Sequence, residues 1–382
     1  MEWNIKIEDL EEKKEDYLLI DMRSAEAFMH GHIPGAINRL EEEILTEENL
    51  WKTSPEKEVV IYCGIGELSR ELTRRLREKN IPAWNLEGGF KAWLTSQSDK
   101  SEPDMLSREE IERYSRHLVL PQVGLEGQQK LKKAKVLVIG AGGLGSPVIM
   151  YLAAAGVGTI GICDYDNVDV SNLQRQIIHD SKRVGENKAE SAKQRVALIN
   201  EETEVITYPM GLSPDNIMEL IEGYDFILDG VDNFPTKFLI NDACVIAEKP
   251  FCHAGVIGFE GQLMTYVPGK GPCYRCLFED IPAGEQIPNC SQAGVLGAMV
   301  GVIGSLQALE ALKYITGAGE LLTGKMLVFD GLTMKSRLIK LGGPVASCRV
   351  CGNETEGKIT NVKESRKEYE VRACEIRNKG EQ

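Results

Sequence analysis

Apolar residues in the N-terminal part of the chain fall into short runs separated by polar and helical stretches. Tyr17–Ile20 and Val59–Tyr62 are two such runs, and Ser69–Lys79 has the spacing of an amphipathic helix. Short apolar runs bounded by turn residues indicate buried strands, whereas apolar positions three and four apart indicate a helix. We therefore predict a small α/β domain over residues 1–97.

A second region repeats this alternation on a larger scale. Apolar strands are expected at Lys135–Ile139, Thr159–Cys163 and Asp225–Leu228, and helical stretches lie between them. Strands that alternate with helices are typical of a parallel sheet covered on both faces. We predict a Rossmann-like α/β domain with a mainly parallel sheet over residues 105–352.

The remaining segments are either polar or unusually apolar. Thr95–Pro103 lacks apolar periodicity and is predicted to contain a linker, assigned to residues 98–104. Residues 353–382 are highly charged and are expected to form either a mobile tail or a peripheral element. Ala293–Leu306 is the longest apolar stretch, but it is short for a membrane span, so we expect a buried helix.

Composition limits the classes of partner. The chain has 382 residues, of which 42% are hydrophobic and 27% charged, as expected for a globular protein of two or three domains. A net charge of −14 disfavours binding to nucleic acid or to an anionic membrane, so a protein or small-molecule partner is expected. The first residues do not resemble a secretion signal, which favours a cytoplasmic location.

A glycine-rich turn, Gly140-Ala141-Gly142-Gly143-Leu144-Gly145, directly follows the predicted strand Lys135–Ile139. Glycines let the backbone approach a phosphate closely, and the N-terminus of the following helix offers unpaired N–H groups. Asp164 ends the next strand, where a carboxylate accepts hydrogen bonds from a ribose. At this point an NAD-dependent dehydrogenase fits as well as an ATP-binding enzyme.

Residues after Asp164 favour transfer of AMP to a carboxylate. Ser171–Arg175 and Lys188 contribute two cations and several amides. Such groups reduce the repulsion between an attacking carboxylate and the phosphates of ATP, and they stabilise the charge on the departing pyrophosphate. Asp232 and Asn233 follow another predicted strand and offer oxygen ligands for Mg²⁺. The alternative is that Asn172 and Arg175 only cap and pair within a loop.

With these motifs, the segment from about Met105 to Cys351 resembles the MoeB and ThiF family, relatives of ubiquitin-activating enzymes. The resemblance implies a homodimer in which Arg116 reaches the nucleotide of the partner subunit. It also implies a substrate, a ubiquitin-like sulfur carrier protein of the MoaD or ThiS type, whose terminal glycine is activated as an acyl adenylate. The implied ATP-binding residues, with Asp232 on Mg²⁺, are Gly143, Asp164, Ser171, Asn172, Leu173, Gln174, Arg175, Lys188, Asp232 and Asn233.

Four of the ten cysteines form two CxxC pairs, Cys273 with Cys276 and Cys348 with Cys351. Four thiolates satisfy one tetrahedral Zn²⁺ and leave no open position, so a structural zinc site is predicted. The alternative is a pair of redox dithiols. The family resemblance supports zinc at the same positions.

Cys290 matches a cysteine that some family members use for covalent chemistry. It precedes the predicted apolar helix, and a helix N-terminus lowers the pKa of a nearby thiol. We expect an acyl disulfide or a thioester with the carrier at Cys290. The alternative is an unreactive loop thiol.

Residues 1 to about 94 resemble rhodanese, the sulfurtransferase module. The resemblance rests on Asp21-Met22-Arg23, Gly31–Ala36, Cys63–Ser69 and Asn85–Trp93. Cys63 ends a strand and begins a tight loop, whose N–H groups stabilise a thiolate and then a persulfide. The alternative is a rhodanese fold kept only for binding.

The loop departs from many rhodanese loops, which carry arginine where this chain has Gly64 and Leu68. We therefore expect poor affinity for thiosulfate, and a protein persulfide such as that of a cysteine desulfurase as the sulfur donor.

Together these features predict an enzyme that adenylates the carrier and passes sulfur from Cys63 to give a thiocarboxylate. Molybdopterin synthesis is the favoured pathway, and thiamine thiazole, cysteine and tRNA thiolation are alternatives. A noncatalytic scaffold for ubiquitin-like proteins is the alternative from another class.

Overall fold

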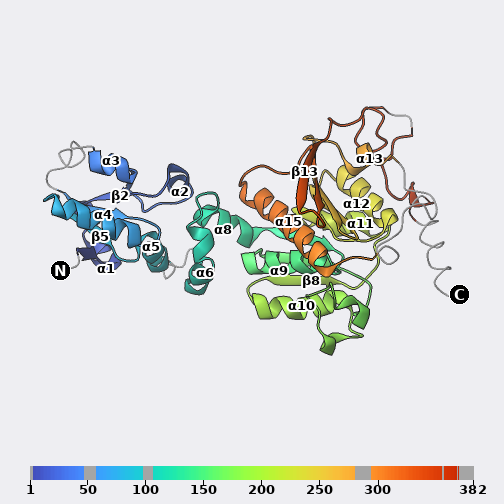
Figure 1. Ribbon diagram of the computed structural model, residues 1–382, viewed down its shortest axis with the longest axis horizontal. Helices are drawn as coiled ribbons and strands as arrows, with labels where there is room; N and C mark the ends of the chain where they lie inside the picture. Colours follow the sequence, from blue (N-terminus) through green and yellow to red (C-terminus); the bar gives the residue numbers. More distant parts are fainter. Residues whose placement is uncertain are drawn as a thin grey trace. The chain divides into compact units, whose positions relative to one another are not determined.

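The computed structural model describes residues 3–46, 57–97, 106–279, 294–354, 357–367 and 369. The chain divides into two compact units (Figure 1). The first contains residues 1–130 with 316–318, and the second contains 131–315 with 319–382.

The first unit is built on a parallel five-stranded sheet in the order β1-β5-β4-β2-β3. The inner strands are rich in branched apolar residues because both of their faces are buried, as in other parallel sheets. The strands are β1 (Asn4–Ile5), β2 (Tyr17–Asp21), β3 (Ile37–Asn38), β4 (Glu58–Tyr62) and β5 (Ala83–Leu86). The helices between them are α1 (Ile7–Glu12), α2 (Ala25–Met29), α3 (Glu41–Thr46), α4 (Glu67–Glu78) and α5 (Gly89–Gln97).

Three further helices follow residue 106: α6 (Arg108–Arg113), α7 (Ser115–Leu118) and α8 (Gly124–Lys133). A capping box between Ser107 and Glu110 fixes the start of α6. Leu106, Ile111 and Leu118 are buried in the hydrophobic cluster that also covers β5 and α5. Helices α6 and α7 therefore pack as part of the first unit, and the predicted linker 98–104 lies outside the described residues.

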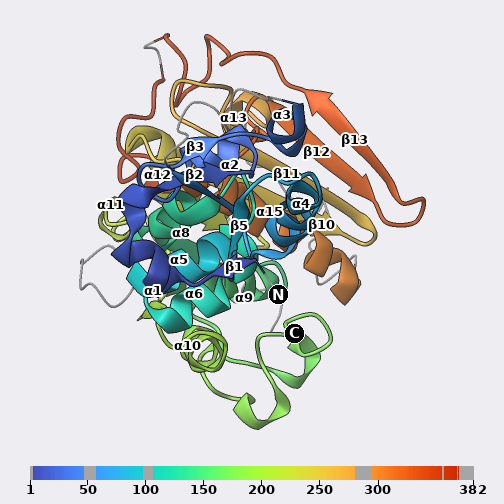
Figure 2. The same cartoon turned by 90° about the vertical axis from the view of Figure 1, so that its left-hand side faces the viewer.

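The second unit contains an eight-stranded sheet in the order β13-β12-β11-β10-β9-β6-β7-β8. The strands from β10 to β8 are parallel, as predicted, and β11, β12 and β13 extend the sheet in antiparallel pairing. Figure 2 shows β12 and β13 side by side at the edge of this sheet. The strands are β6 (Lys135–Ile139), β7 (Thr159–Cys163), β8 (Glu204–Tyr208), β9 (Phe226–Asp229), β10 (Phe251–Ile257), β11 (Glu260–Tyr266), β12 (Lys325–Asp330) and β13 (Lys335–Lys340).

Helices cover both faces of this sheet (Figure 1). Successive residues of β6 point to opposite faces, so Val136 and Val138 join one core while Leu137 and Ile139 join the other. Helices α9 (Gly145–Ala155), α10 (Lys188–Ile199) and α15 (Gly297–Thr316) pack in the first of these cores. Helices α11 (Ile217–Glu222), α12 (Phe234–Ile246) and α13 (Tyr274–Leu277) pack in the second.

Helix α15 is long and apolar enough, by length and composition alone, to cross a membrane. In the structure, however, Met299, Val300 and Ile303 are buried against the sheet. The buried Glu310 accepts a hydrogen bond of 2.6 Å from the hydroxyl of Thr265 on β11. The helix therefore serves as a core helix of the second unit, as predicted for this apolar stretch.

The predicted charged tail supplies part of the second core. Ile359, Val362 and Tyr369 are buried, and the hydroxyl of Tyr369 donates a hydrogen bond to Asp242 on α12. Of the two forms expected for residues 353–382, a peripheral element agrees with these described residues.

Candidate functional site

The glycine-rich turn joins β6 to α9 and has almost no room for side chains. Gly140 has a φ of 95°, which favours glycine. A Cβ on Gly145 would lie 1.9 Å from the carbonyl oxygen of Gly140, and a Cβ on Gly143 would lie 3.1 Å from Val300 on α15. The turn therefore lets a phosphate approach its backbone closely at the N-terminus of α9.

Asp164 follows β7 and shapes this turn. Its Oδ2 accepts a hydrogen bond of 2.8 Å from the N–H of Ala141, and its Oδ1 accepts one of 2.9 Å from the N–H of Asp166. Burial raises the pKa of the Asp164 carboxyl. Each oxygen has a further lone pair, so Asp164 is still able to accept a ribose hydroxyl.

Lys188 begins α10 and is mostly buried, with its Nζ 2.9 Å from Oδ2 of Asp166. Asp166 itself is half exposed. The ammonium group therefore lies next to the segment that carries Asp164. There it is able to bind a phosphate of the nucleotide in place of the Asp166 carboxylate.

The loop 171–175 lies against the start of α15. Asp169 and Asn172 cap each other's backbone, and Arg175 Nη1 donates to the carbonyl of Ser171 at 3.1 Å. A Cβ on Gly297 would lie 2.3 Å from the carbonyl oxygen of Gln174. These contacts fix the loop against α15; the side chains of Ser171 and Gln174 are exposed, and that of Leu173 is partly buried.

Asp232 and Asn233 follow β9, and they differ in what they offer to a metal ion. Asn233 caps α12, and its Oδ1 accepts a hydrogen bond of 3.0 Å from the N–H of Thr236. The exposed side chain of Asp232 has no hydrogen bond or ion pair to any described residue. Asp232 thus supplies the free carboxylate, and one carboxylate with substrate phosphates suits Mg²⁺.

These groups meet at one edge of the sheet. Strand β6 lies between β7 and β9, and all three are parallel. The glycine-rich turn, Asp164 and Asp232 therefore follow the carboxyl ends of three neighbouring strands. The chain reverses its strand order here, and this is where open α/β sheets bind nucleotides.

Two predicted site residues lie elsewhere. Arg116 is exposed on α7 in the first unit, so its contact with the nucleotide of a partner subunit stays a prediction. Cys290 lies outside the described residues.

The two CxxC pairs come together, although they are far apart in the sequence. Their four Sγ atoms all lie within 4.8 Å of one another, with Cys273 to Cys348 at 3.6 Å and Cys276 to Cys351 at 3.3 Å. A tetrahedral zinc ion with Zn–S bonds of about 2.3 Å holds its sulfurs about 3.8 Å apart. Both the donors and their spacing fit a structural Zn²⁺.

A buried ion pair supports this four-cysteine cluster. Arg275, which lies between the first two cysteines, donates from Nε and Nη2 to Asp242 at 2.7 and 2.8 Å. Tyr369 donates to the same carboxylate. The centre is therefore tied both to α12 and to the segment that follows the last cysteine.

Cys63 lies at the start of a loop that leads into α4. Its Sγ accepts hydrogen bonds from the N–H of Gly66 at 3.2 Å and from the hydroxyl of Ser69 at 3.4 Å. Burial raises the pKa of the Cys63 thiol, but the hydrogen bonds from Ser69 and the loop N–H groups outweigh it, so the pKa is lowered. The loop is thus suited to hold a thiolate or a persulfide.

Ser69 links this sulfur to the next strand. Its Oγ is 2.7 Å from Oδ1 of Asn85, and it has a single proton to donate. The Cys63 sulfur and the Asn85 oxygen therefore share this proton, and Nδ2 of Asn85 donates to Oδ1 of Asn4 at 2.9 Å. The sequence analysis placed Ser69 in the cysteine loop but missed Asn85 as its partner.

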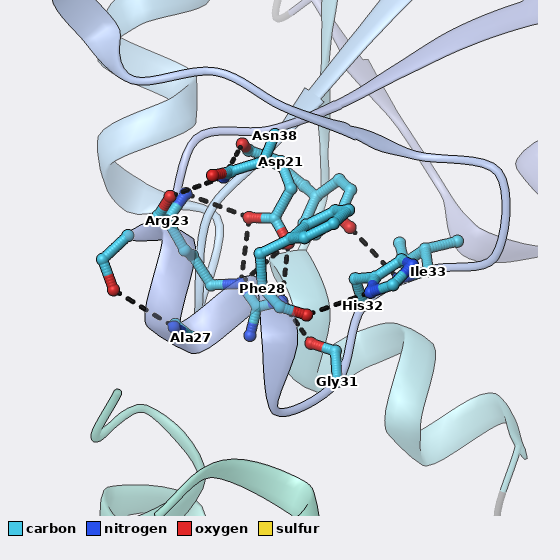
Figure 3. Close-up of polar contacts among 10 residues, drawn as sticks. Asp21, Arg23, Ala27, Phe28, Gly31, His32, Ile33 and Asn38 are labelled. Atoms are coloured by element: carbon cyan, nitrogen blue, oxygen red, sulfur yellow. Dashed lines mark hydrogen bonds and ion pairs between the residues drawn. The ribbon is translucent and has the colours of Figure 1, made fainter. Parts of the chain in front are cut away.

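The arginine of the Asp21-Met22-Arg23 motif has a structural role. Figure 3 shows Arg23 between Asp21 and the carbonyl of Gly31, with its Nη2 2.6 Å from each oxygen. Its guanidinium also lies 3.9 Å from the centre of the Phe90 ring. Because Asp21 balances its charge, Arg23 does not serve as a free cation for an anionic sulfur donor.

The structure explains why glycine follows Cys63. A Cβ on Gly64 would lie only 3.1 Å from Cγ1 of Val119, which follows α7. Lys91 donates its backbone N–H to Gly64 and its ammonium to Glu112 on α6, at 3.0 and 2.6 Å. A longer side chain at position 64 would therefore begin in tight contact with the residue that follows α7.

Three charged or polar residues near the carboxyl end of β9 could not be assigned from the sequence. Asp229, Lys237 and His253 are buried, and Lys237 and His253 both bond to the carboxylate of Asp229. A carboxylate at the end of an apolar strand and a lysine within an apolar helix are the signals that point to such a cluster.

Comparisons with known proteins agree with the predicted division of the chain into two different domains. The ThiF family model matches residues 114–350, and the rhodanese-like domain model matches residues 6–96. The chain is similar to the Adenylyltransferase and sulfurtransferase MOCS3 of Mus musculus, with 44% identity over 76% of this chain and 65% of the mouse protein. MOCS3-1 of Zea mays, which carries the same description, is 46% identical over 70% of this chain and 58% of the maize protein.

The chain thus spans 58 to 65% of the length of these relatives. Among solved structures, E. coli MccB with AMPCPP and MccA has a TM-score of 0.57 and 25% identity, over 75% of this chain and 82% of MccB.

Proposed function

We propose that this chain is an adenylyltransferase and sulfurtransferase that acts on a ubiquitin-like sulfur carrier. The chain belongs to the ThiF family, and a rhodanese-like domain precedes the family region. The observation that carries the proposal is the meeting of the glycine-rich turn, Asp164 and Asp232 at one sheet edge. Family membership also favours adenylation over the dehydrogenase that the glycine turn alone allowed.

In the first step, the terminal glycine carboxylate of the carrier attacks the α-phosphorus of ATP. An acyl adenylate forms, and pyrophosphate leaves. The N–H groups of the turn bind phosphate oxygens, Asp164 accepts the ribose hydroxyls, and Arg175 and Lys188 balance the charge on the pyrophosphate. Asn172 and Asn233 hold the loops that surround the nucleotide.

Two metal ions are part of the proposal. Asp232 would hold Mg²⁺, which would supply charge neutralisation at the triphosphate. Zn²⁺ on Cys273, Cys276, Cys348 and Cys351 has a structural role only, because four thiolates leave no open position.

In the second step, the terminal sulfur of a Cys63 persulfide attacks the adenylated carbonyl carbon, and AMP leaves. The product is an acyl disulfide between the carrier and Cys63. Cys290 then attacks the Cys63 sulfur, which releases the carrier thiocarboxylate and leaves a Cys63–Cys290 disulfide. An external thiol reduces that disulfide before the next cycle.

Partners follow from this chemistry. The carrier is of the MoaD or ThiS type, with molybdopterin synthesis favoured, and thiamine thiazole, cysteine or tRNA thiolation as the alternatives. The sulfur donor is the persulfide of a cysteine desulfurase. The protein is a cytoplasmic homodimer in which Arg116 reaches the nucleotide of the partner subunit. A noncatalytic scaffold is the alternative, and the free carboxylate of Asp232 argues against it.

Asp232→Ala should lower carrier-dependent exchange between ATP and pyrophosphate on the order of a hundredfold, because the Mg²⁺-bound phosphates lose their carboxylate. Glu222→Ala is the control, since it removes an exposed carboxylate at the end of α11, before β9 begins. Circular dichroism should show both variants folded. Full exchange in Asp232→Ala would remove this residue from the mechanism.

A further inference from the structure

A buried ionic cluster lies directly behind the residues that follow β9. Asp229 ends this strand and is 1% exposed. Lys237 on α12 places its Nζ 3.2 and 3.1 Å from the two carboxylate oxygens of Asp229. His253 on β10 places its Nδ1 2.7 Å from Oδ2 of the same carboxylate.

The charges of this cluster balance. Burial favours a neutral Asp229, but Lys237 and His253 outweigh it and lower the pKa of this carboxyl. Burial, and then the nearby Lys237, lowers the pKa of His253, which therefore donates its Nδ1 proton as a neutral imidazole. One carboxylate and one ammonium remain, and the ammonium also donates to the carbonyl of Ala254 at 2.8 Å.

The cluster is connected to the residue that faces the nucleotide. Oδ1 of Asp229 accepts a hydrogen bond of 3.1 Å from the N–H of Val231, the residue before Asp232. The carbonyl of Asp229 accepts a hydrogen bond of 2.8 Å from the buried Gln307 on α15. Gly230 lies against the glycine-rich turn, because a Cβ on Gly140 would be 2.9 Å from the carbonyl oxygen of Gly230.

Stability alone does not account for such a buried ionic cluster. Charges buried in a protein core lose hydration, and well-packed apolar residues of similar size are often equally or more stabilising. Three elements, β10, α12 and α15, nevertheless contact Asp229 at the end of β9 through polar groups. Together, these bonds hold the backbone at the start of the turn 230–233.

We infer that Lys237 and His253 are positioning residues for nucleotide binding: through Asp229 they hold the 230–233 turn so that the carboxylate of Asp232 meets the Mg²⁺ of bound Mg·ATP. The inference rests on the proposed function, in which Asp232 carries the magnesium ion. Neither residue touches the nucleotide. Their effect should therefore appear in the part of ATP affinity that depends on Mg²⁺.

His253→Ala tests this role by isothermal titration of the full-length protein with ATP, once with Mg²⁺ and once with EDTA. With Mg²⁺ the Kd for ATP should rise about tenfold, since one hydrogen bond to a charged group is lost. With EDTA it should not change. His253→Asn should restore the wild-type value, because an asparagine amide is able to donate to Asp229 in place of Nδ1.

Cys252→Ala is the matched control. Cys252 precedes His253 on the same strand, and it is buried in the core that contains Val136 and Val138. Its truncation should therefore lower the stability of the fold and leave the hydrogen bonds to the Asp229 carboxylate in place. If His253→Ala kept the full Mg²⁺-dependent gain in affinity, or lost affinity equally with EDTA, the inference would be wrong while the proposed function stood. A wild-type protein whose ATP affinity ignored Mg²⁺ would instead refute the magnesium role of Asp232, and the inference with it.

Discussion

Cys348→Ser should leave the second unit without its zinc ion and largely unfolded at 37 °C. Binding of a structural zinc ion contributes about 10–16 kcal/mol, which is comparable to or larger than the total stability of about 5–15 kcal/mol of a typical domain. Cys348 is one of four sulfurs within 4.8 Å, and it comes from a segment that the ion ties back to α13. Removal of one thiolate also opens the site to water.

Two measurements on purified protein test this expectation. Elemental analysis should give one zinc per wild-type chain and almost none for Cys348→Ser, and thermal unfolding followed by circular dichroism should show a large fall in Tm. Cys244→Ala provides the control, because Cys244 is buried in the same core but is not part of the cluster. A Cys348→Ser protein with unchanged zinc content and Tm would show that the cluster is not a zinc site.

Cys63→Ser should separate the two chemical steps. Formation of the carrier thiocarboxylate should fall on the order of a thousandfold, because a serine oxygen cannot carry the transferred sulfur. Exchange between ATP and pyrophosphate should stay close to the wild-type rate, since the nucleotide site belongs to the other unit. Both rates are measured with the same carrier protein, under single-turnover conditions for the sulfur step.

Cys163→Ala is the matched control for this variant. Burial raises the pKa of the Cys163 thiol to about 12, so it is not expected to carry sulfur at neutral pH. Its replacement should leave both rates nearly unchanged. Thiocarboxylate formation by Cys63→Ser at the wild-type rate would assign the sulfur step to another group, or to free sulfide.

Features encoded by neighbouring residues could be predicted from the sequence. The runs Tyr17–Ile20 and Lys135–Ile139 lie in strands, and the glycine-rich turn lies at the start of α9. The two CxxC pairs predicted a four-sulfur centre, because two thiols three residues apart bind one side of an ion wherever the chain brings them.

Features that depend on contacts between distant segments could not be predicted in this way. No local pattern shows that His253 bonds to Asp229, or that Tyr369 bonds to Asp242. The departure at Gly64 was visible in the sequence, but its close approach to Val119, which lies far along the chain, was not.

Under the proposed function, this chain converts the terminal carboxylate of a carrier into a thiocarboxylate at the expense of ATP. The most direct test is the intact mass of a small carrier protein ending in Gly-Gly after incubation with the wild-type chain, Mg·ATP and a persulfide donor. We expect a carrier with one oxygen replaced by sulfur, and only when ATP is present. An unchanged carrier mass, with no pyrophosphate released, would contradict it.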